Sequence, residues 1–304
     1  MKKILVIGSF MTDLVIQTEK VPVDGETTIG KTFNRFTGGK GANQAVAAAR
    51  LGGDVTMVGK LGKDDFGKEH MESLKANQVD CDSVWMDEEA STGIGNIVID
   101  RNGNNRIIVV PGANLNLTEQ DIEAIENVIA ATDIVVLQLE IPISTVYKAI
   151  DLAHKHHKTV VLNPAPAQKI DSQYISKIDF IIPNETEASL LTGIHVNDVE
   201  DAEKASQHFI RQGYQNVIIT LEDKGVIYRN RSKVRHYQPY QVKAVDTTAA
   251  GDSFIGGFVY GLSRGLNIDQ AVQLAVAASA LTVTKLGAQP SLPTIEEVQN
   301  LLAD

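Results

Sequence analysis

The sequence predicts an α/β protein with a doubly wound, mostly parallel sheet flanked by helices, and a small β-sheet lid beside it. Three observations lead to this prediction. From residue 117 onward, short apolar runs alternate with helical stretches, which is typical of a parallel sheet covered by helices. Several of these runs end in polar residues, as strands that line a ligand crevice do. Residues 92–110 hold two β-rich runs with no helix between them, which indicates an antiparallel insertion.

Size, charge and cysteine content narrow the class of protein. The 304 residues, 43% of them hydrophobic, can supply the core of one large domain over residues 1–304. Lys and Arg number 28 against 38 Asp and Glu, and the net charge of −10 argues against nucleic-acid and anionic-membrane partners, although a local site could still bind an anion. Cys81 is the only cysteine, so an intrachain disulfide is impossible. The apolar run at 4–8 is too short for a secretory leader and no run could span a membrane, so a cytoplasmic protein is expected.

The first strand is expected at residues 4–9, and Asp13 follows near its carboxyl end, where ligands of open α/β sheets collect. Residues 25–32 match the phosphate-binding pattern G-x-x-x-x-G-K-[ST] letter for letter. That loop requires a buried strand before it and a helix after it. Pro22 precedes the match and residues 33–36 alternate like a strand, so we predict a β-hairpin region and treat the match as chance.

A glycine-rich segment at residues 37–44 leads into an alanine-rich helix, which the glycines at 52–53 end. Glycines let a ligand approach the backbone closely. Lys40 and Asn43 in this segment offer a charge and an amide suited to sugar hydroxyls. The alternative is a plain turn before a helix, with Lys40 in solvent.

A strand at 55–60 and a helix at 65–76 come next. Within residues 92–110, the pair Asn102-Gly103 stands between two β-rich runs, which is a strong signal for a hairpin. Paired with the strands at about 14–36, this hairpin would form a small sheet that stands off the main domain as a lid.

Four further apolar runs that end in polar residues predict strands at 134–140, 160–164, 180–184 and 217–225. The carboxyl ends of parallel strands share one edge of a sheet, so the polar residues, Glu140 among them, are expected to converge on one crevice. His154, His156 and His157 lie together in a helix-like stretch. No carboxylate or fourth ligand accompanies them, so a solvated polar face is favoured over a metal site.

The small residues between Asp246 and Asp252, followed by the apolar run at 254–260, predict a loop that opens a buried helix. The first N–H groups of such a helix have no partners and its dipole is positive there, so the segment can bind phosphate or another anion. A carboxylate beside a phosphate is unfavourable unless it takes part in chemistry, such as accepting a proton from an attacking hydroxyl. Asp252 therefore fits two roles, a general base or a helix cap. An alanine-rich helix at 271–284 and a loop at 285–291 follow.

Two of these segments resemble the signatures of the ribokinase family, the PfkB-type carbohydrate kinases. The early Gly-Gly segment that leads to Asn stands at residues 38–43, and the late D-T-x-G/A-A-G-D segment stands at residues 246–252. Segments at 163–167, 183–187 and 287–291 also resemble the family. The resemblance therefore covers essentially the whole chain.

The resemblance implies a doubly wound α/β domain whose lid often forms a dimer contact, so a homodimer through the lid is expected. It implies transfer of a phosphoryl group from ATP to the 5-hydroxyl of D-ribose, giving ribose 5-phosphate and ADP, with Asp252 as general base, Mg²⁺ accompanying ATP, and K⁺ as an activator. Fructose, a deoxyribose and a nucleoside are alternative acceptors, although the aromatic content of 5% weakly disfavours a nucleoside. A catalytically idle sugar-binding regulator is a third possibility, against which the pair Gly251-Asp252 speaks.

The same resemblance assigns residues to the sites. The sugar site maps to Met11, Thr12, Asp13, Gly39, Lys40, Gly41, Ala42, Asn43, Glu140 and Asp252. The ATP site maps to Asn184, Thr220, Leu221, Glu222, Asp223, Lys224, Gly225, Gly251 and Asp252, with Glu187 helping indirectly to hold Mg²⁺. The K⁺ site maps to Asp246, Thr248, Thr282, Lys285, Gly287 and Ser291, mostly through backbone carbonyls.

Two positions depart from the family pattern. Met11 stands where many members carry Asn, and a Met side chain cannot hydrogen-bond a hydroxyl well. Ala249 stands where Gly is commoner in the late signature. Its methyl group is tolerable if the residue avoids a positive φ.

Overall fold

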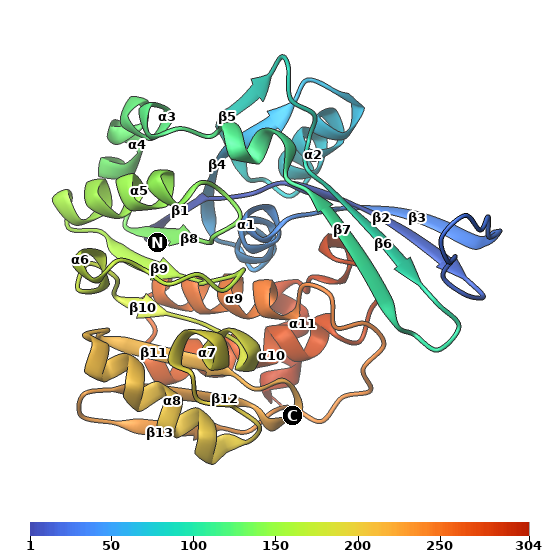
Figure 1. Ribbon diagram of the computed structural model, residues 1–304. Coiled ribbons are helices and arrows are strands. Elements are labelled where there is room, and N and C mark those ends of the chain that lie inside the picture. Colours follow the sequence, from blue (N-terminus) through green and yellow to red (C-terminus); the bar gives the residue numbers. More distant parts are fainter. Residues whose placement is uncertain (304) are drawn as a thin grey trace.

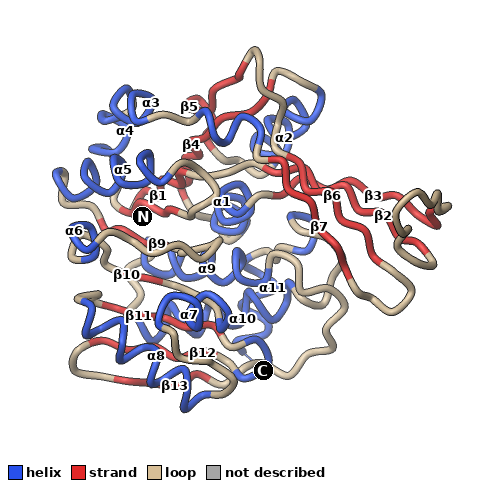
Figure 2. Tube along the Cα trace, viewed as in Figure 1, coloured by secondary structure: helices blue, strands red, loops and turns tan. Residues whose placement is uncertain are grey.

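The computed structural model describes residues 1–303, which form one large sheet with helices on both faces and one small sheet that projects from it (Figures 1 and 2). The large sheet has nine strands in the order β13-β12-β11-β10-β9-β8-β1-β4-β5. Their bounds are β1 Lys3–Ile7, β4 Asp54–Gly62, β5 Asp80–Asp87, β8 Ile134–Leu137, β9 Thr159–Leu162, β10 Phe180–Ile181, β11 Asn216–Thr220, β12 Val226–Asn230 and β13 Val234–Tyr237. The strands from β11 to β5 pair in parallel, which confirms the predicted fold class.

The central strands are buried on both faces, and their side chains alternate between two cores. In β1, Ile4 and Val6 belong to one apolar cluster while Leu5 and Ile7 belong to the other, as the period of two residues in a strand requires. The first cluster is covered by α1 Lys40–Arg50, α2 Asp65–Ala76, α9 Ala250–Ser263 and α10 Ile268–Thr282. The second is covered by α3 Glu119–Ala124, α4 Glu126–Ala131, α5 Ile143–Lys155, α6 Ser172–Ile175, α7 Glu185–Thr192 and α8 Val199–Gln212. The last helix, α11 Ile295–Ala303, packs against α10.

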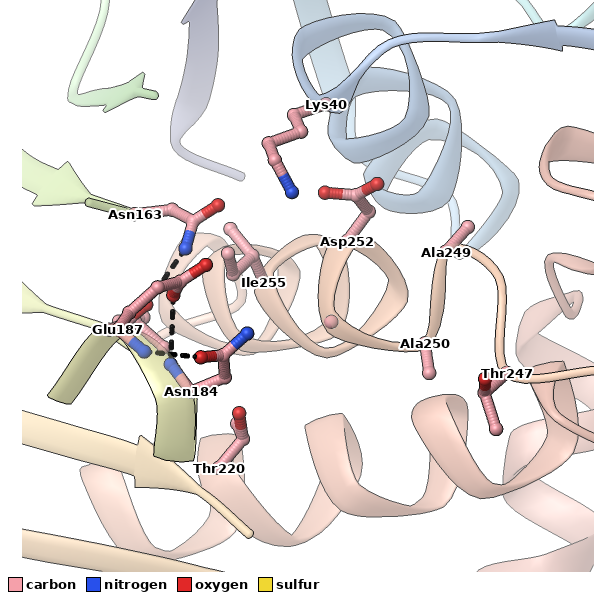
Figure 3. A pocket seen from close by; sticks show the side chains of 12 residues that line it. Lys40, Asn163, Asn184, Glu187, Thr220, Thr247, Ala249, Ala250, Asp252 and Ile255 are labelled. Atoms are coloured by element: carbon pink, nitrogen blue, oxygen red, sulfur yellow. Dashed lines mark hydrogen bonds between the residues drawn. The ribbon is translucent and has the colours of Figure 1, made fainter. Parts of the chain in front are cut away.

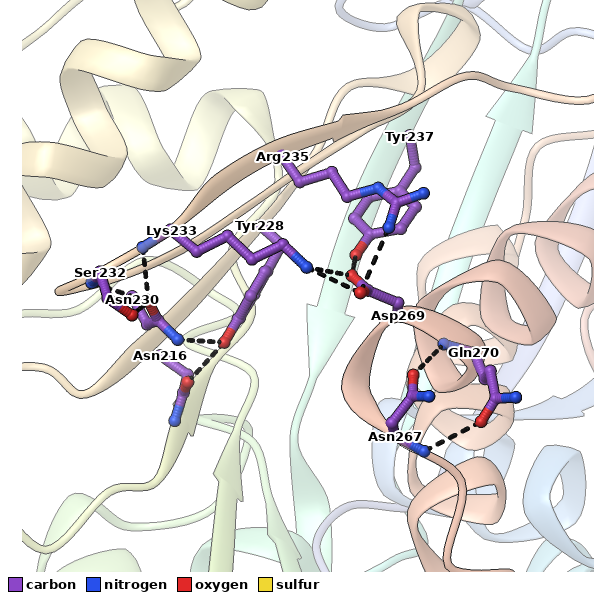
Figure 4. Close-up of polar contacts among 10 residues, drawn as sticks. All are labelled: Asn216, Tyr228, Asn230, Ser232, Lys233, Arg235, Tyr237, Asn267, Asp269 and Gln270. Carbon is purple, nitrogen blue, oxygen red and sulfur yellow. Dashed lines mark hydrogen bonds and ion pairs between the residues drawn. The ribbon is translucent and has the colours of Figure 1, made fainter.

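One edge of the large sheet is an antiparallel hairpin, β12–β13, that the sequence did not predict. Its basic side chains reach the start of α10 (Figure 4): Lys233 Nζ lies 2.7 Å from Asp269 and Arg235 lies 3.2 Å from it. The hydroxyl of Tyr237 also donates to Asp269. The hairpin is short and its polar residues break the apolar alternation, so the strand pattern there is weak.

The small sheet has the order β3-β2-β6-β7, with β2 Met11–Thr18, β3 Gly30–Gly38, β6 Ile94–Ile99 and β7 Asn105–Val110. The hairpin β6–β7 turns through Asn102 and Gly103, whose φ is +82°, as the Asn-Gly signal predicts. β2 pairs antiparallel with β3 and in parallel with β6. The phosphate-loop match at 25–32 is a turn that enters β3, and no helix follows it, so the decision to reject it is confirmed.

The three histidines lie where α5 ends. His156 contacts the carboxylate of Glu126 at 2.7 Å, and His157 leaves the helix with a φ of +54°. Within residues 1–303, no group of three or more His, Cys, Asp or Glu side chains is arranged to hold a metal ion. None of the helices in that span has the length and hydropathy needed to cross a bilayer.

Candidate active site

A cavity of about 210 Å³ lies at the N-terminus of α9, beside the carboxyl ends of the central strands (Figure 3). Its lining includes Asp252 in the first turn of α9, Lys40 at the start of α1 and Glu187 in α7. The backbone N–H groups of Gly251 and Asp252 lie in the first turn of α9, so no earlier turn of the helix supplies carbonyls to accept their hydrogen bonds. The predicted anion site and the predicted crevice at the strand ends are therefore one place.

Ala249, the residue before this helix, has φ +61° and ψ +9°. The condition under which the methyl group of Ala249 would be tolerated without strain, a negative φ, is therefore not met. The chain must turn sharply there so that α9 begins at Ala250, and the left-handed conformation makes that turn at a cost of roughly 1–2 kcal/mol for a residue with a Cβ. This strained residue directly precedes the anion-binding turn.

The carboxylate of Asp252 is only 8% exposed and is held by two side-chain amides from α1. Nδ2 of Asn43 donates to Oδ2 of Asp252, and Nε2 of Gln44 donates to Oδ1, both at 2.9 Å. Burial raises the pKa of Asp252, while the nearby Lys40 ammonium and the two amides oppose the shift. Oδ1 of Asn43 is buried without a partner among the described residues, so the site holds a free acceptor for a hydroxyl group.

The glycine-rich segment brings α1 against the end of β1. Gly39 has φ +88°, and a Cβ at Gly39 or Gly41 would come within 2.6 Å of the backbone of Met11 or Ser9. The backbone N–H of Ala42 donates to the carbonyl of Ser9 at 3.0 Å. Only glycine permits this approach at 39 and 41, which sets Lys40 at the edge of the cavity and Asn43 beside Asp252.

Glu140, just beyond β8, is held at the same edge. Its Oε2 accepts from the hydroxyl of Ser9 and from the backbone N–H of Lys40 at 3.1 Å. The prediction that polar groups after several strands meet in one crevice is confirmed for Asn163, which follows β9 and lines the cavity. Glu140 does not line it but bonds the backbone of Lys40, which does.

Asp13 lies at the root of the small sheet. An ideal Cβ on either Gly38 or Gly95, which lie in the two strands beside β2, would come within 2.8 Å of an oxygen of Asp13. Burial, with added repulsion from Glu140 and Asp252, raises the pKa of Asp13 to about 7. Three carboxyl groups of the predicted sugar site thus influence one another electrostatically.

Thr12 is placed differently from its neighbours Met11 and Asp13 in β2. Met11 is buried. Thr12 points to the opposite side of β2, where its hydroxyl lies 3.2 Å from Nε2 of the buried His70. The structure therefore directs the Thr12 side chain toward α2, away from the side chains of its neighbours.

Lys40 carries the cationic charge of the cavity. Burial disfavours that charge, but the carboxylates of Asp252, Glu140 and Glu187 outweigh burial and raise the pKa of Lys40. Figure 3 shows the Lys40 ammonium and the Asp252 carboxylate facing the same space. The cavity therefore offers a protonated amine and helix N–H groups to an anion.

The predicted nucleotide residues divide into two groups. Asn184 and Thr220 line the cavity, and Asn184 forms a capping box with Glu187 at the start of α7. Residues 221–225 do not line it: Leu221 is fully buried in the second apolar cluster, and Lys224 pairs with Glu185 at 2.7 Å. These residues form a loop beyond β11, with Glu222 and Asp223 exposed to solvent.

The residues of the predicted K⁺ site come from two loops and the end of α10. Asp246 joins the loops, because its carboxylate accepts from the N–H and hydroxyl of Thr248 and from the N–H of Gly287, the last at 2.9 Å. The side chain of Lys285 pairs with Glu297 at 2.6 Å. The hydroxyl of Thr282 donates to Ser253 in α9 or to the carbonyl of Ala278 in α10. The hydroxyl of Ser291 donates to the carbonyl of Ala288. The donors present are oxygen atoms, which suits a hard monovalent cation.

Several residues of the site were not predicted. Gln44 bonds Asp252, Ser9 bonds Glu140, and Gly95 leaves room for Asp13. Gln44 follows directly after a predicted site residue, and this adjacency was the one available signal. Gly95 and Ser9 could be recognised only from strand pairing and from the approach of α1.

These features define a class of protein. A helix N-terminus and a lysine can bind the phosphates of a nucleotide, and a buried carboxylate beside them can accept the proton of an attacking hydroxyl. In an α/β fold, this combination is the site of a small-molecule kinase. The chain matches the pfkB family of carbohydrate kinases over residues 1–295 and belongs to that family.

Relatives and solved structures agree with this assignment. The chain is 41% identical to a ribokinase of Haemophilus influenzae, covering 99% of this chain and 98% of the relative. It is 38% identical to a deoxyribokinase of Salmonella typhimurium, covering 99% and 98%. The structure of Arabidopsis thaliana ribokinase complexed with ribose and ATP matches with a TM-score of 0.95 and 32% identity, covering 100% of this chain and 99% of that one. The fold is therefore ribokinase-like along the whole chain.

Proposed function

We propose that this protein transfers the γ-phosphoryl group of ATP to the 5-hydroxyl of D-ribose, giving ribose 5-phosphate and ADP. The observation that carries the proposal is the position of Asp252, buried in the first turn of α9 and facing a cavity that also contains Lys40. A match to a structure that holds ribose and ATP supports the choice of substrates.

Asp252 is the general base in this proposal. Its carboxylate accepts the proton of the attacking hydroxyl, which makes the hydroxyl oxygen a stronger nucleophile as the new P–O bond forms. Burial raises the pKa of Asp252, so the carboxylate is a stronger base than one in water. The amides of Asn43 and Gln44 hold the carboxylate in place while it acts.

The N–H groups of Gly251 and Asp252 and the Lys40 ammonium stabilise negative charge on the phosphoryl group during transfer. The hydroxyl groups of the sugar donate hydrogen bonds to the carboxylates of Asp13 and Glu140 and to Oδ1 of Asn43, which has no partner among the described residues. This arrangement keeps the reacting hydroxyl close to Asp252.

Two cations complete the proposal. The carboxylate of Glu187 lines the cavity, and burial raises its pKa, so a cation at this wall would favour its charged form. Glu187 would help to hold Mg²⁺ through water, and Mg²⁺ supplies charge neutralisation to the phosphates of ATP. Asp246 and the carbonyls of the two adjoining loops would hold K⁺ behind residues 249–251 and so stabilise the turn that Ala249 strains.

The exposed strand of the small sheet supports a homodimer. In β7, Ile107, Ile108, Val109 and Val110 are 45–66% exposed, and Phe33 in β3 is 62% exposed. Apolar strands exposed in this way favour pairing with another chain. We propose that two copies join through this sheet, and that the protein works in the cytoplasm, where ATP is supplied.

A deoxyribose is the second candidate acceptor, because a deoxyribokinase is 38% identical over nearly the full chain. Ribose and 2-deoxyribose differ by one hydroxyl. A site that hydrogen-bonds that hydroxyl rejects the sugar that lacks it, since its buried polar groups would be left unpaired.

The deciding experiment measures ADP release with Mg-ATP across ribose, 2-deoxyribose, fructose and adenosine, with and without K⁺. We expect the highest kcat/KM on ribose and stimulation by K⁺. A higher kcat/KM on 2-deoxyribose or fructose would keep the mechanism and replace the acceptor. Sugar binding without ADP release from any acceptor would contradict the kinase proposal.

A further inference from the structure

Two buried glutamines stand behind the proposed general base. Gln44 in α1 and Gln138, just beyond β8, are both fully buried. Nε2 of Gln138 donates to Oε1 of Gln44 at 2.6 Å, and Nε2 of Gln44 donates to Oδ1 of Asp252 at 2.9 Å. The chain of contacts thus runs from the large sheet through α1 to the first turn of α9.

The direction of this chain follows from the chemistry of its members. A carboxylate only accepts hydrogen bonds, so Gln44 must present its amide nitrogen to Asp252. The amide oxygen of Gln44 then faces Gln138, which must present its own nitrogen. Asn163 reinforces the orientation, because its Oδ1 accepts from Nε2 of Gln44 at 3.3 Å while its Nδ2 donates to the carbonyl of Ile182.

The environment of Gln138 accommodates its side chain but leaves one of its polar atoms unpaired. A Cβ on Gly8 would lie 1.9 Å from Oε1 of Gln138, so the glycine at the end of β1 is required for the Gln138 side chain to fit. Oε1 of Gln138 has no partner in the part of the chain that the structure describes. An unpaired buried amide oxygen destabilises the fold, and an apolar side chain would avoid that penalty. Packing alone would favour apolar side chains at positions 44 and 138, so the two glutamines are there for another reason.

We propose that Gln44, oriented by Gln138, is a positioning residue that holds the Asp252 carboxylate in the plane from which it accepts the proton of the sugar hydroxyl. This inference rests on the proposed function of Asp252. Asn43 and Gln44 occupy one oxygen each, so the carboxylate cannot rotate about its Cβ–Cγ bond without losing both hydrogen bonds. Oδ1 of Asn43 has no partner among the described residues, whereas Nε2 and Oε1 of Gln44 are both hydrogen-bonded. Besides Asp252, Gln44 bonds only Gln138 and Asn163 among the described side chains, so it has no polar atom left for a ligand.

The test uses Gln44→Met, which keeps the length of the side chain and removes its hydrogen bonds. We expect kcat to fall by about 10- to 100-fold, because a base misplaced by a fraction of an ångström loses that order of rate. KM for the sugar should stay within about threefold, since Gln44 does not reach the sugar. Because the Gln44 amide lowers the pKa of Asp252, its removal should shift the acidic limb of the kcat–pH profile to higher pH.

Gln138→Met is the matched variant at the far end of the chain of contacts. It leaves Gln44 in place but free to reorient, so we expect a smaller change of the same kind. In the double variant, Gln138→Met should add almost nothing to the effect of Gln44→Met, because the second contact acts only through the first. Thermal unfolding should show lower stability for Gln44→Met, because Nε2 of Gln138 and Oδ1 of Asp252 each lose a buried hydrogen bond. It should change little for Gln138→Met, where an unpaired Oε1 of Gln44 replaces the unpaired Oε1 of Gln138.

Three outcomes would overturn the inference while leaving the proposed function intact. They are an unchanged kcat and acidic limb in Gln44→Met, additive effects in the double variant, or a fall in kcat that only equals the loss of folded protein at the assay temperature. If Gln44→Met does not fold, Gln138→Met alone decides, and an acidic limb that does not move contradicts the proposal. Absence of turnover in the unmodified protein would instead contradict the proposed function itself.

Discussion

The two sides of the site at the N-terminus of α9 are held in different ways. On the side of the proposed sugar site, Asp252 is held by side-chain amides of α1, and Glu140 is held by Ser9 just after β1 and by the backbone of Lys40. On the side of the proposed cation site, Thr247 and Thr248 are exposed, and the loop is held mainly by the hydrogen bonds of Asp246 to Thr248 and Gly287. The structure thus fixes the position of the Asp252 carboxylate before any ligand binds. The loop around Thr247 and Thr248 has few contacts of its own, and a bound ion or phosphate could add to them.

The most severe change to the side of the proposed sugar site is Asp252→Asn. The amide keeps the size of the side chain but cannot accept a proton from the hydroxyl. We expect kcat to fall by about 10²- to 10⁴-fold, with KM for ribose nearly unchanged. Steady-state ADP release measures both constants. A variant that kept most of its kcat would contradict the role of Asp252 as base.

Asp13→Asn tests whether the buried carboxylate of Asp13 lowers the free energy of unfolding while it strengthens sugar binding. Its folded pKa of about 7 lies above the ordinary value of 3.8, so its ionisation lowers the free energy of unfolding as pH rises between these values. Asparagine removes this contribution. We expect the variant to be more stable than the unmodified protein at about pH 8, and its unfolding temperature to depend less on pH.

The same variant should bind the sugar more weakly. Loss of a charged acceptor should raise KM for ribose by about 10- to 100-fold. Thermal unfolding at about pH 5 and pH 8, with sugar kinetics at the higher pH, measures both effects. An unfolding temperature with an unchanged pH dependence would show that Asp13 does not titrate in this range.

The cation side is tested by Asp246→Asn. We expect the K⁺ concentration for half-maximal activation to rise about tenfold, because hydrogen bonds to the carboxylate that joins the two loops are worth about 1.5–3 kcal/mol each. KM for the sugar should not change. Asp269→Asn, at the start of α10 and bonded to the β12–β13 hairpin, is the matched control and should leave the K⁺ response unaltered. Equal K⁺ responses in both variants would place the cation elsewhere.

The smallest expected effect belongs to Ala249→Gly. Glycine adopts φ +61° without strain, so the free energy of unfolding should rise by about 0.5–1 kcal/mol. Ala250→Gly is the control one residue along. Ala250 is the first residue of α9, and glycine there should destabilise the protein by a similar amount. Urea unfolding distinguishes the two, and a loss of stability in both would show that Ala249 is not strained.

Much of the fold could be predicted because apolar periodicity reports burial directly. The helix expected at 65–76 is α2 Asp65–Ala76, and the Asn-Gly signal located the β6–β7 hairpin. The hairpin β12–β13 was missed because its strands are short and carry basic residues that bond Asp269 far along the chain. The φ of Ala249 was left open, because residue type alone does not set φ where a loop must meet a buried helix.

By itself, the sequence determined the class of fold, the glycine-rich approach to α1 and the identity of the candidate base, since each depends on residues close together in the chain. Only the tertiary structure decided how that base is held. Gln44 lies 208 residues from Asp252 and 94 from Gln138, so no local pattern records their contact. An amide side chain takes its orientation from the donors and acceptors that folding places around it, and these partners come together only when the sheet, α1 and α9 pack.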